Sequence, residues 1–470
     1  MVSVHTTKGD RFLRSFIDTE KGTVSRELYV NEDVFQQELE QIFGRCWLFI
    51  GHESLVPNPG DFMITRMGTE EVLLVRDRKD KQIRAFLNSC RHRGEKVCRY
   101  DQGNALVFTC PFHAWTYDSA GRLVGAAGIN NPNSYAGALD RDEWGLVEVG
   151  KFKNYYGTLW ATWDKKAPSL EEYLGPFAES VRYMAESSDG QDNGLEVFTP
   201  FQKWRLPTNW KVPAFTSSRD PEHGAMTHRS VNSAAIGPAR GMNDDGGRHR
   251  MRQYRIPSKS YVVGDHNLGH GGGWTDYMEP GIAPYSDFNA WFEPGVDDYY
   301  RGQHAKKMEK YKDRIAPPAG HDAGHICVWP NFIMDSWRWR FWHPHETGVV
   351  ERWSLFGVDK EAPKVVKDAI RHYAMRYNGP TGCTESDDME NWNYVFPASR
   401  GVTARKYNYS FTSGLGRGIV RPEISNSIVF NDNRTEEAHR ARFSRWLAFM
   451  EAKSWDDLYP VNKDANHRIW

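Results

Sequence analysis

Two short stretches of this sequence, Cys90-Arg91-His92 and Cys110-Pro111-Phe112-His113, decide the architecture of the first part of the chain. As a pattern they read C-x-H, then seventeen residues, then C-x2-H. Each stretch brings one thiol and one imidazole to the same short segment. Gly94 follows the first stretch and Pro111 lies inside the second, which predicts two tight turns. The four side chains are therefore expected on two loop tips, as a candidate metal site.

Two kinds of metal centre use two thiolates and two imidazoles. In a Rieske [2Fe–2S] cluster the cysteine pair holds one iron and the histidine pair holds the other. A structural zinc site also takes these four ligands, but zinc fingers keep the cysteines in one arm and the histidines in the other. Here each arm is mixed, which favours a Rieske cluster held by Cys90, His92, Cys110 and His113. The chain is then at minimum an electron carrier.

Length and composition set the broad class. The chain has 470 residues, of which 39% are hydrophobic and 26% charged, an ordinary globular mixture with room for more than one domain. Its net charge of −1 gives no general attraction to nucleic acid or to an anionic membrane. No apolar run is long enough to span a bilayer, and the first residues lack the apolar core of a signal peptide. The six cysteines show no disulfide framework, so a cytoplasmic location is expected.

The pattern of apolar residues predicts an α+β chain. Four short β-like runs separated by turn residues surround the cluster arms, at 62–65, 72–75, 83–87 and 106–109. They predict a small antiparallel β domain over residues 45–160, which presents the cluster on loops. Residues 1–44 and 161–470 are expected to form a larger catalytic domain with an antiparallel sheet and flanking helices. Helices are predicted at 31–43, 362–377 and 435–451, with Asn31 and Thr435 as N-caps.

A second metal site is needed, because a Rieske cluster moves single electrons and has no open coordination position. His223 and His228 are five residues apart, with Asp220 upstream. Two histidines and one carboxylate form the facial triad that holds non-haem Fe(II). On a regular helix these histidines would point about 140° apart, so an irregularity is predicted between them. Asp220 can accept a hydrogen bond from the non-metal nitrogen of His223. The residues alone do not choose the third ligand among Asp387, Asp388 and Glu390.

Taken together, these motifs resemble the large (alpha) subunit of Rieske non-haem iron aromatic ring-hydroxylating dioxygenases. The resemblance extends over essentially the whole chain. It includes Gln202-Lys203-Trp204, Asn209-Trp210-Lys211, the D-x2-H-x4-H segment at 220–228 and the E-S-D-D-M-E-N-W segment at 385–392.

The resemblance implies the roles of several residues. Asp388 would be the carboxylate ligand of the mononuclear iron, beside His223 and His228. Asp220 would link His223 to the cluster histidine His113 of a neighbouring subunit, so that electrons cross between subunits.

The resemblance also implies the reaction and the partners. A ferredoxin, a reductase or both would supply NAD(P)H electrons in a bacterial cytoplasm. The assembly would be a homotrimer or an α3β3 ring with a small beta subunit. Both atoms of O2 would enter an aromatic ring to give a cis-dihydrodiol, as in the catabolism of aromatic hydrocarbons. Two alternatives are a ferredoxin-like electron carrier, disfavoured by the length of the chain, and a Rieske monooxygenase or demethylase acting on another class of substrate.

Departures from the family pattern bear on the substrate. Thr216 and Ser217 follow the Asn-Trp-Lys motif and are expected to line the pocket, and Arg219 stands beside Asp220. The segment 332–342 reads as one alternating strand, with Arg338 and Arg340 on the same face as Met334. An inward Arg338 could clamp a carboxylate. The expected substrate is therefore either a polycyclic hydrocarbon or an aromatic carboxylate such as a phthalate.

Overall fold

The computed structural model describes residues 11–135, 139–199, 201–217, 220, 223–229, 258–277, 295–311, 323–335, 338–421, 427–430 and 434–458. Its chain divides into two units, one of Phe43–Leu170 and one of Met1–Ile42 with Glu171–Trp470. The larger unit is therefore discontinuous in sequence, and the smaller one is inserted into it. The sequence predicted residues 45–160 for the inserted domain, and this boundary stays a prediction.

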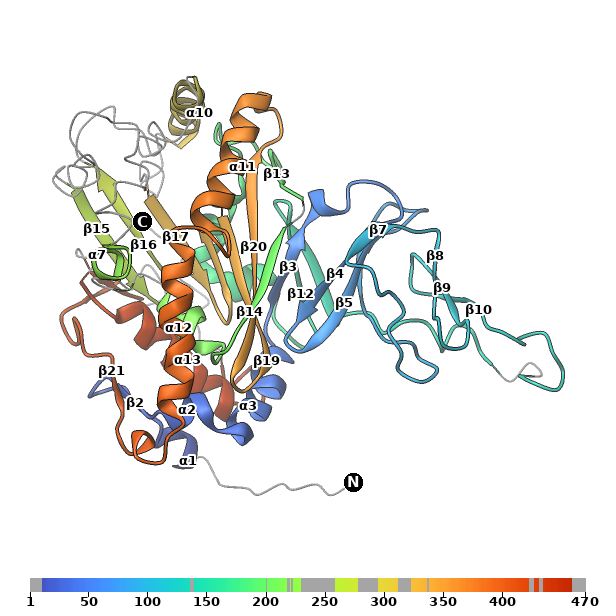
Figure 1. Ribbon diagram of the computed structural model, residues 1–470, viewed down its shortest axis with the longest axis horizontal. Coiled ribbons are helices and arrows are strands. Elements are labelled where there is room, and N and C mark those ends of the chain that lie inside the picture. Colours follow the sequence, from blue (N-terminus) through green and yellow to red (C-terminus); the bar gives the residue numbers. More distant parts are fainter. Residues whose placement is uncertain are drawn as a thin grey trace. The chain divides into compact units, whose positions relative to one another are not determined.

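In its described residues the smaller unit is built mainly from antiparallel strands (Figure 1), with a short 3-10 turn, η2 Glu53–Leu55. One sheet has the order β6-β5-β4-β7, from Ile83–Leu87, Glu70–Arg76, Asp61–Met67 and Gln102–Asn104. A second has the order β10-β9-β8, from Leu123–Gly125, Thr116–Asp118 and Val107–Thr109. The third has the order β11-β12-β3, from Lys151–Tyr155, Thr158–Thr162 and Leu48–His52.

The four predicted β-like runs are confirmed, since β4, β5, β6 and β8 lie there, and the local sequence explains why these strands form. Val72 and Leu73 lie in β5 and are fully buried, as expected of apolar residues in a sheet. Met67 pairs with Glu70 across a two-residue turn in which Gly68 has a φ of 64°. That left-handed conformation suits glycine and fixes the register of the β4–β5 hairpin.

The larger unit contains an antiparallel sheet of ten described strands, as Figure 1 shows in part. Its order is β13-β20-β19-β18-β17-β16-β15-β23-β22, and β14 also pairs with β20. The strands are β13 Leu195–Val197, β14 Gln202–Leu206, β15 Ser258–Gly264, β16 Gly271–Tyr277, β17 Ala323–Val328, β18 Phe332–Asp335, β19 Arg338–Glu346, β20 Val349–Asp359, β22 Ile419–Arg421 and β23 Ser427–Phe430. A small sheet joins β1 Ile17–Asp18, β2 Thr23–Val24 and β21 Tyr409–Ser410.

Helices pack on this sheet, α11 against β20 and α13 against β15. The longer helices are α3 Glu32–Glu38, α5 Ala178–Ala185, α10 Val296–Tyr311, α11 Lys364–Asn378, α12 Glu385–Ser399 and α13 Glu437–Glu451. The shorter ones are α1 Arg11–Arg14, α2 Glu27–Val30, α4 Leu170–Leu174, α6 Lys211–Thr216, α7 His223–Met226, the 3-10 turns η3 Gly175–Phe177 and η5 Ala404–Lys406, and the π-turn η1 Leu39–Phe43. The predicted α+β class, with an antiparallel β insertion, is confirmed. In the part of the chain that the structure describes, no helix is long and apolar enough to cross a membrane.

The helix predictions hold with small shifts at their ends. The Asn31 side chain accepts a hydrogen bond from the backbone N–H of Val34, at 3.2 Å, and so caps α3 as predicted. The prediction of Thr435 as N-cap is wrong by one residue, since Glu436 holds that position of α13, but the Thr435 hydroxyl still accepts from the N–H of Glu437, the first residue of the helix, at 3.2 Å. Both contacts satisfy N–H groups that the first helical turn leaves without a partner.

The prediction of a single strand over 332–342 is wrong. The segment forms two antiparallel strands, in which Met334 pairs with Trp339 and Ile333 with Arg340. Residues that face each other across strands share one face of the sheet. Arg338 and Arg340 therefore keep a common face, as predicted, but Met334 lies on the opposite one. Ser336 and Trp337 lie outside the described residues.

Candidate metal centres

The two cluster arms are equivalent loops. In each arm the backbone carbonyl of the cysteine accepts from the N–H four residues later, Gly94 at 2.9 Å and Ala114 at 3.0 Å. Each cysteine N–H donates to the carbonyl five residues later, at 2.8 Å and 2.7 Å. Gly94 and Ala114 have φ values of 81° and 56°, so both loops turn back through a left-handed residue. The arms follow β6 and β8, which places the four predicted ligands on neighbouring loops.

The four side chains of these loops suit an iron–sulfur cluster. Cys90 and Cys110 are buried, with 3% and 2% exposure, and burial raises the pKa of the Cys110 thiol, which also interacts with Cys90. The rings of His92 and His113 lie 4.6 Å apart, centroid to centroid. His92 Nδ1 is buried and has no hydrogen-bond partner among the described residues, as expected of a nitrogen reserved for a metal. The Tyr117 hydroxyl lies 3.4 Å from Cys90 Sγ, a contact of the kind that tunes a cluster's potential.

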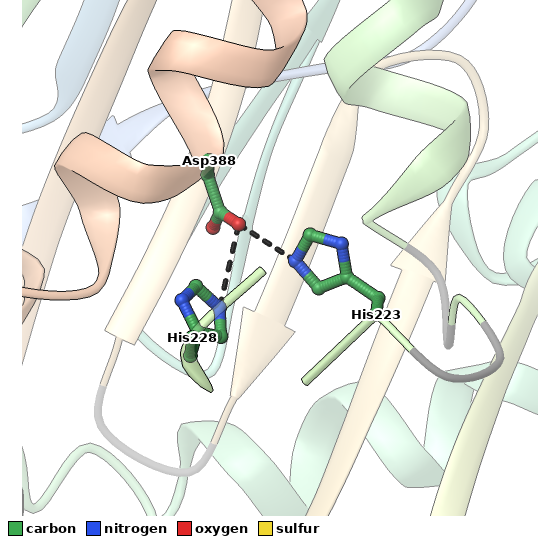
Figure 2. A group of neighbouring side chains, drawn as sticks. All are labelled: His223, His228 and Asp388. Carbon is green, nitrogen blue, oxygen red and sulfur yellow. Dashed lines mark hydrogen bonds and ion pairs between the residues drawn. The ribbon is translucent and has the colours of Figure 1, made fainter. Parts of the chain in front are cut away.

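The second predicted site also assembles in the structure. His223 begins α7, His228 follows it in a turn, and Asp388 lies in the first turn of α12 (Figure 2). One ligand atom from each side chain lies within 4.8 Å of the other two. The predicted irregularity is the end of the short helix α7, which lets two side chains five residues apart converge. The N-terminal turn of α12 stabilises a carboxylate through the helix dipole.

Both histidines use the same ring nitrogen toward the centre. Nε2 of His223 lies 2.7 Å from Asp388 Oδ1 and Nε2 of His228 lies 3.4 Å from it, as the dashed lines of Figure 2 show. Each Nδ1 instead faces a further carboxylate, Asp220 at 3.7 Å for His223 and Asp387 at 3.3 Å for His228. For His228 this is the carboxylate–histidine–metal arrangement that fixes the tautomer of a metal ligand. Nδ1 of His223 instead makes its hydrogen bond with the Thr227 hydroxyl at 3.3 Å, so the predicted hydrogen bond to Asp220 does not form. Two imidazoles and one carboxylate therefore fit a non-haem iron.

The charges of the site follow from its burial and its close carboxylates. Burial raises the pKa of Asp220 to about 6, against the opposing effect of His223. Burial disfavours the His223 cation, but the hydrogen bond to Asp388 and the neighbouring carboxylates outweigh it and raise the pKa of His223. Burial raises the pKa of Asp388, yet its contacts with His223 and His228 bring it below the ordinary value. The anionic Asp388 is thus ready to bind a cation.

A cavity of about 320 Å³ opens beside these three side chains. Thr216 and Ser217 line it, at the end of α6, and so does Arg338. The Thr216 hydroxyl already donates to the Val212 carbonyl at 2.6 Å. Arg338 Nη2 lies 2.6 Å from Asp335 Oδ2. Their roles in substrate binding stay predictions, and Arg219 lies outside the described residues.

Sequence reasoning did not assign several side chains that line this cavity. They are His325, Asp335, Arg340, Tyr373, Tyr377 and Trp392. Tyr373 and Tyr377 lie one turn apart on α11, a face that the sequence pattern alone makes a core face. Asp335 and Arg340 come together only because 332–342 forms a hairpin. A signal for the turn would have been the acidic residue that interrupts the apolar run at Asp335.

Comparison with known proteins shows the family of the chain. Residues 46–136 match the family model of the Rieske [2Fe-2S] domain. The chain is 35% identical over 460 residues to the biphenyl dioxygenase subunit alpha of Paraburkholderia xenovorans, covering 95% of each chain. It is 33% identical over 453 residues to the benzene 1,2-dioxygenase subunit alpha of Pseudomonas putida, again with 95% of each covered. A solved structure of naphthalene 1,2-dioxygenase with indole bound superimposes with a TM-score of 0.81 at 26% identity, covering 95% of this chain and 96% of that one.

These relatives settle the family and its cofactors. They confirm both predicted cofactors of the chain, the Rieske cluster and the mononuclear iron of the catalytic domain. The individual ligands of the two metal centres stay predictions. The chain belongs to the large (alpha) subunits of the Rieske non-haem iron aromatic ring-hydroxylating dioxygenases, oxidoreductases that incorporate O2.

Proposed function

We propose that this chain is the terminal oxygenase of a system that adds both atoms of O2 to adjacent carbons of an aromatic ring, giving a cis-dihydrodiol. The observation that carries the proposal is the convergence of His223, His228 and Asp388 at the edge of a cavity with aromatic walls. These three side chains would hold the iron, while Cys90, His92, Cys110 and His113 would hold the cluster. When bound, the iron supplies the chemistry with O2.

The surrounding residues hold the site in order. Asp387 accepts from Nδ1 of His228 and so keeps that ring protonated on this nitrogen and its Nε2 free for the metal, while Nδ1 of His223 has the Thr227 hydroxyl at 3.3 Å and the Asp220 carboxylate at 3.7 Å. Tyr373, Tyr377 and Trp392 offer ring faces and edges to an aromatic substrate. Together they would orient a flat ring inside the cavity.

Electrons would reach the site from partner proteins. We propose a ferredoxin, a reductase or both as donors, and a homotrimer or a ring with a small beta subunit as the assembly. Asp220 would carry the link between His223 and His113 of a neighbouring subunit. Its carboxylate lies close to His223 and its side chain is 33% exposed, which suits such a bridge. A bacterial cytoplasm completes the proposal, and none of the six cysteines forms a disulfide.

Product analysis under 18O2 tests the reaction. The chain would be supplied with a reductase, a ferredoxin and, where one exists, its small subunit, and offered biphenyl, naphthalene, benzoate and phthalate. A cis-diol carrying two labelled atoms is expected. A product with one labelled atom, or loss of a methyl group from a methylated substrate, would contradict the proposal and identify a monooxygenase or demethylase.

A further inference from the structure

The cavity is lined by three charged side chains of one hairpin, Asp335 on β18 with Arg338 and Arg340 on β19. Arg338 Nε donates to Asp335 Oδ2 at 2.8 Å, and its Nη1 donates to Asn378 Oδ1. Arg340 Nη2 donates to both oxygens of the same carboxylate, each at 3.2 Å. Two guanidinium groups thus share one carboxylate, which leaves an excess of one positive charge on this part of the lining.

This excess charge is well removed from water. The side chains of Asp335 and Arg338 are each 19% exposed, and that of Arg340 is 8% exposed. Burial raises the pKa of Asp335, but Arg340 and Arg338 outweigh this effect and hold it below its ordinary value, so its charge is present. Other carboxylates on the cavity, Asp220 and Asp388, lie at the metal centre, where they would balance the charge of a bound divalent iron. The hairpin charge therefore has no counterion of its own in the lining.

Arg340 is the less satisfied of the two arginines. Its Nε is buried and has no hydrogen-bond partner in the part of the chain that the structure describes. Arg338 instead is held between Asp335 and Asn378. An uncharged ring placed over Arg340 would dehydrate its guanidinium further and offer nothing in return, which costs free energy. A carboxylate placed beside the guanidinium would supply the missing negative charge.

The rest of the lining suits the ring of such a molecule. Tyr373 and Tyr377 of α11 stack on each other, with centroids 5.1 Å apart and planes at 25°, and both line the cavity. Asn378 follows directly on the same helix and binds Arg338. Aromatic and cationic groups are thus adjacent along one helix and one hairpin.

We propose that the substrate of this site is an aromatic ring bearing a carboxylate, whose carboxylate binds Arg340, while Asp335 and Asn378 hold Arg338 in position beside it. This inference rests on the proposed function, because it names the substrate class of the same cavity. It resolves the choice between hydrocarbon and carboxylate in favour of the carboxylate.

Binding without turnover tests the inference. The oxygenase with both metals in place, kept without reductant, would be titrated calorimetrically with benzoate and with benzamide, its neutral analogue of the same shape. We expect benzoate to bind about tenfold more tightly or better, since one charge-assisted hydrogen bond is worth about that factor. Equal affinities, or tighter binding of benzamide, would overturn the inference.

Variants assign the effect to the hairpin. Arg340→Met removes the charge at similar length and is expected to abolish the preference for benzoate. Asp335→Asn keeps the shape, raises the net charge by one and should tighten benzoate binding severalfold with little effect on benzamide. Arg371→Met is the control, because Arg371 lies on the same helix as the two tyrosines and its side chain is 50% exposed. This variant should change neither affinity. An unchanged preference in Arg340→Met would overturn the role of Arg340. If that variant does not fold, Asp335→Asn and the wild-type preference still decide.

The two proposals fail separately. Preferred binding of benzoate with no labelled diol from any ring would remove the proposed reaction and leave the substrate class intact. Doubly labelled diols from hydrocarbons, with benzamide bound as tightly as benzoate, would support the reaction and remove the carboxylate assignment.

Discussion

Replacing Glu385 with Gln should destabilise the larger unit strongly, because this carboxylate neutralises a buried guanidinium. Arg352 and Glu385 have side-chain exposures of 0% and 1%, and Arg352 Nη2 donates to Glu385 Oε2 at 2.8 Å. Glu385 begins α12, one turn before Asp388. The ion pair therefore ties the start of the helix that presents the carboxylate ligand to strand β20.

The size of the effect follows from which charges remain. Glu385→Gln keeps the shape but removes the charge that pairs with Arg352, whose Cζ also lies 4.9, 5.6 and 5.7 Å from the ring centroids of Trp204, Trp342 and Trp392. Removing one partner of a buried pair typically costs about 3–5 kcal/mol in the free energy of unfolding. Removing both charges, as in Arg352→Met with Glu385→Leu, should cost clearly less, because no unpaired charge stays buried.

Urea unfolding followed by tryptophan fluorescence measures these differences, with the visible spectrum of the cluster as a check on the smaller unit. Lys364→Met serves as the control, since its ion pair with Asp368 is exposed to solvent and should contribute little to stability. A loss below about 1 kcal/mol for Glu385→Gln, or a double variant as unstable as the sum of the two single variants, would refute the reasoning.

Three further predictions concern other parts of the chain. Gly94→Ala should lower the stability of the cluster arm by about 1 kcal/mol and Ala114→Gly should be neutral or stabilising, because both positions have positive φ. Thermal bleaching of the cluster measures both variants. Equal shifts in the two variants would contradict the equivalence of the arms. Asp220→Asn should keep both metals and slow single-turnover electron transfer, whereas the matched Asp387→Asn should not; a normal rate in Asp220→Asn would remove the bridge. His270 is buried as a neutral ring whose Nε2 donates to the Tyr173 carbonyl and whose Nδ1 accepts from the Trp329 N–H, and burial lowers its pKa to about 3 from 6.5. Below pH 6.5 the imidazole of His270 takes up a proton in the unfolded chain but not in the folded chain. The contribution of His270 to stability is therefore present above pH 6.5 and lost as the pH falls, by at most about 1.4 kcal/mol per pH unit. Unfolding free energies at pH 7 and 5 should therefore differ more in the wild type than in His270→Asn.

Much of the fold could be predicted from local sequence, because the signals act over a few residues. Asn31 caps the helix that follows it, and the apolar runs around the cluster arms form strands wherever turn residues separate them. The cluster arms are a local pattern too, since each pair of ligands lies within four consecutive residues. The hairpin at 332–342 was missed because the alternation of Arg338 and Arg340 was extended back through Asp335, the acidic residue at which β18 ends.

The catalytic site depends on contacts that no local pattern carries. His223 and Asp388 are 165 residues apart, and the choice of Asp388 over Asp387 came from the family resemblance. In the structure both carboxylates contact His228, but only Asp388 lies near Nε2 of both histidines. The meeting of Asp335, Arg338 and Asn378 likewise requires β18, β19 and α11 to be folded together.

Metal analysis of Asp388→Ala tests the central claim most directly, since the claim is that the chain holds a mononuclear iron apart from its cluster. The variant would be purified in parallel with the wild type, and its iron content and visible spectrum would be recorded. We predict that total iron falls from about three to about two per chain while the spectrum of the [2Fe–2S] cluster is unchanged. Unchanged iron content, or loss of the cluster spectrum with retention of the third iron, would contradict the account.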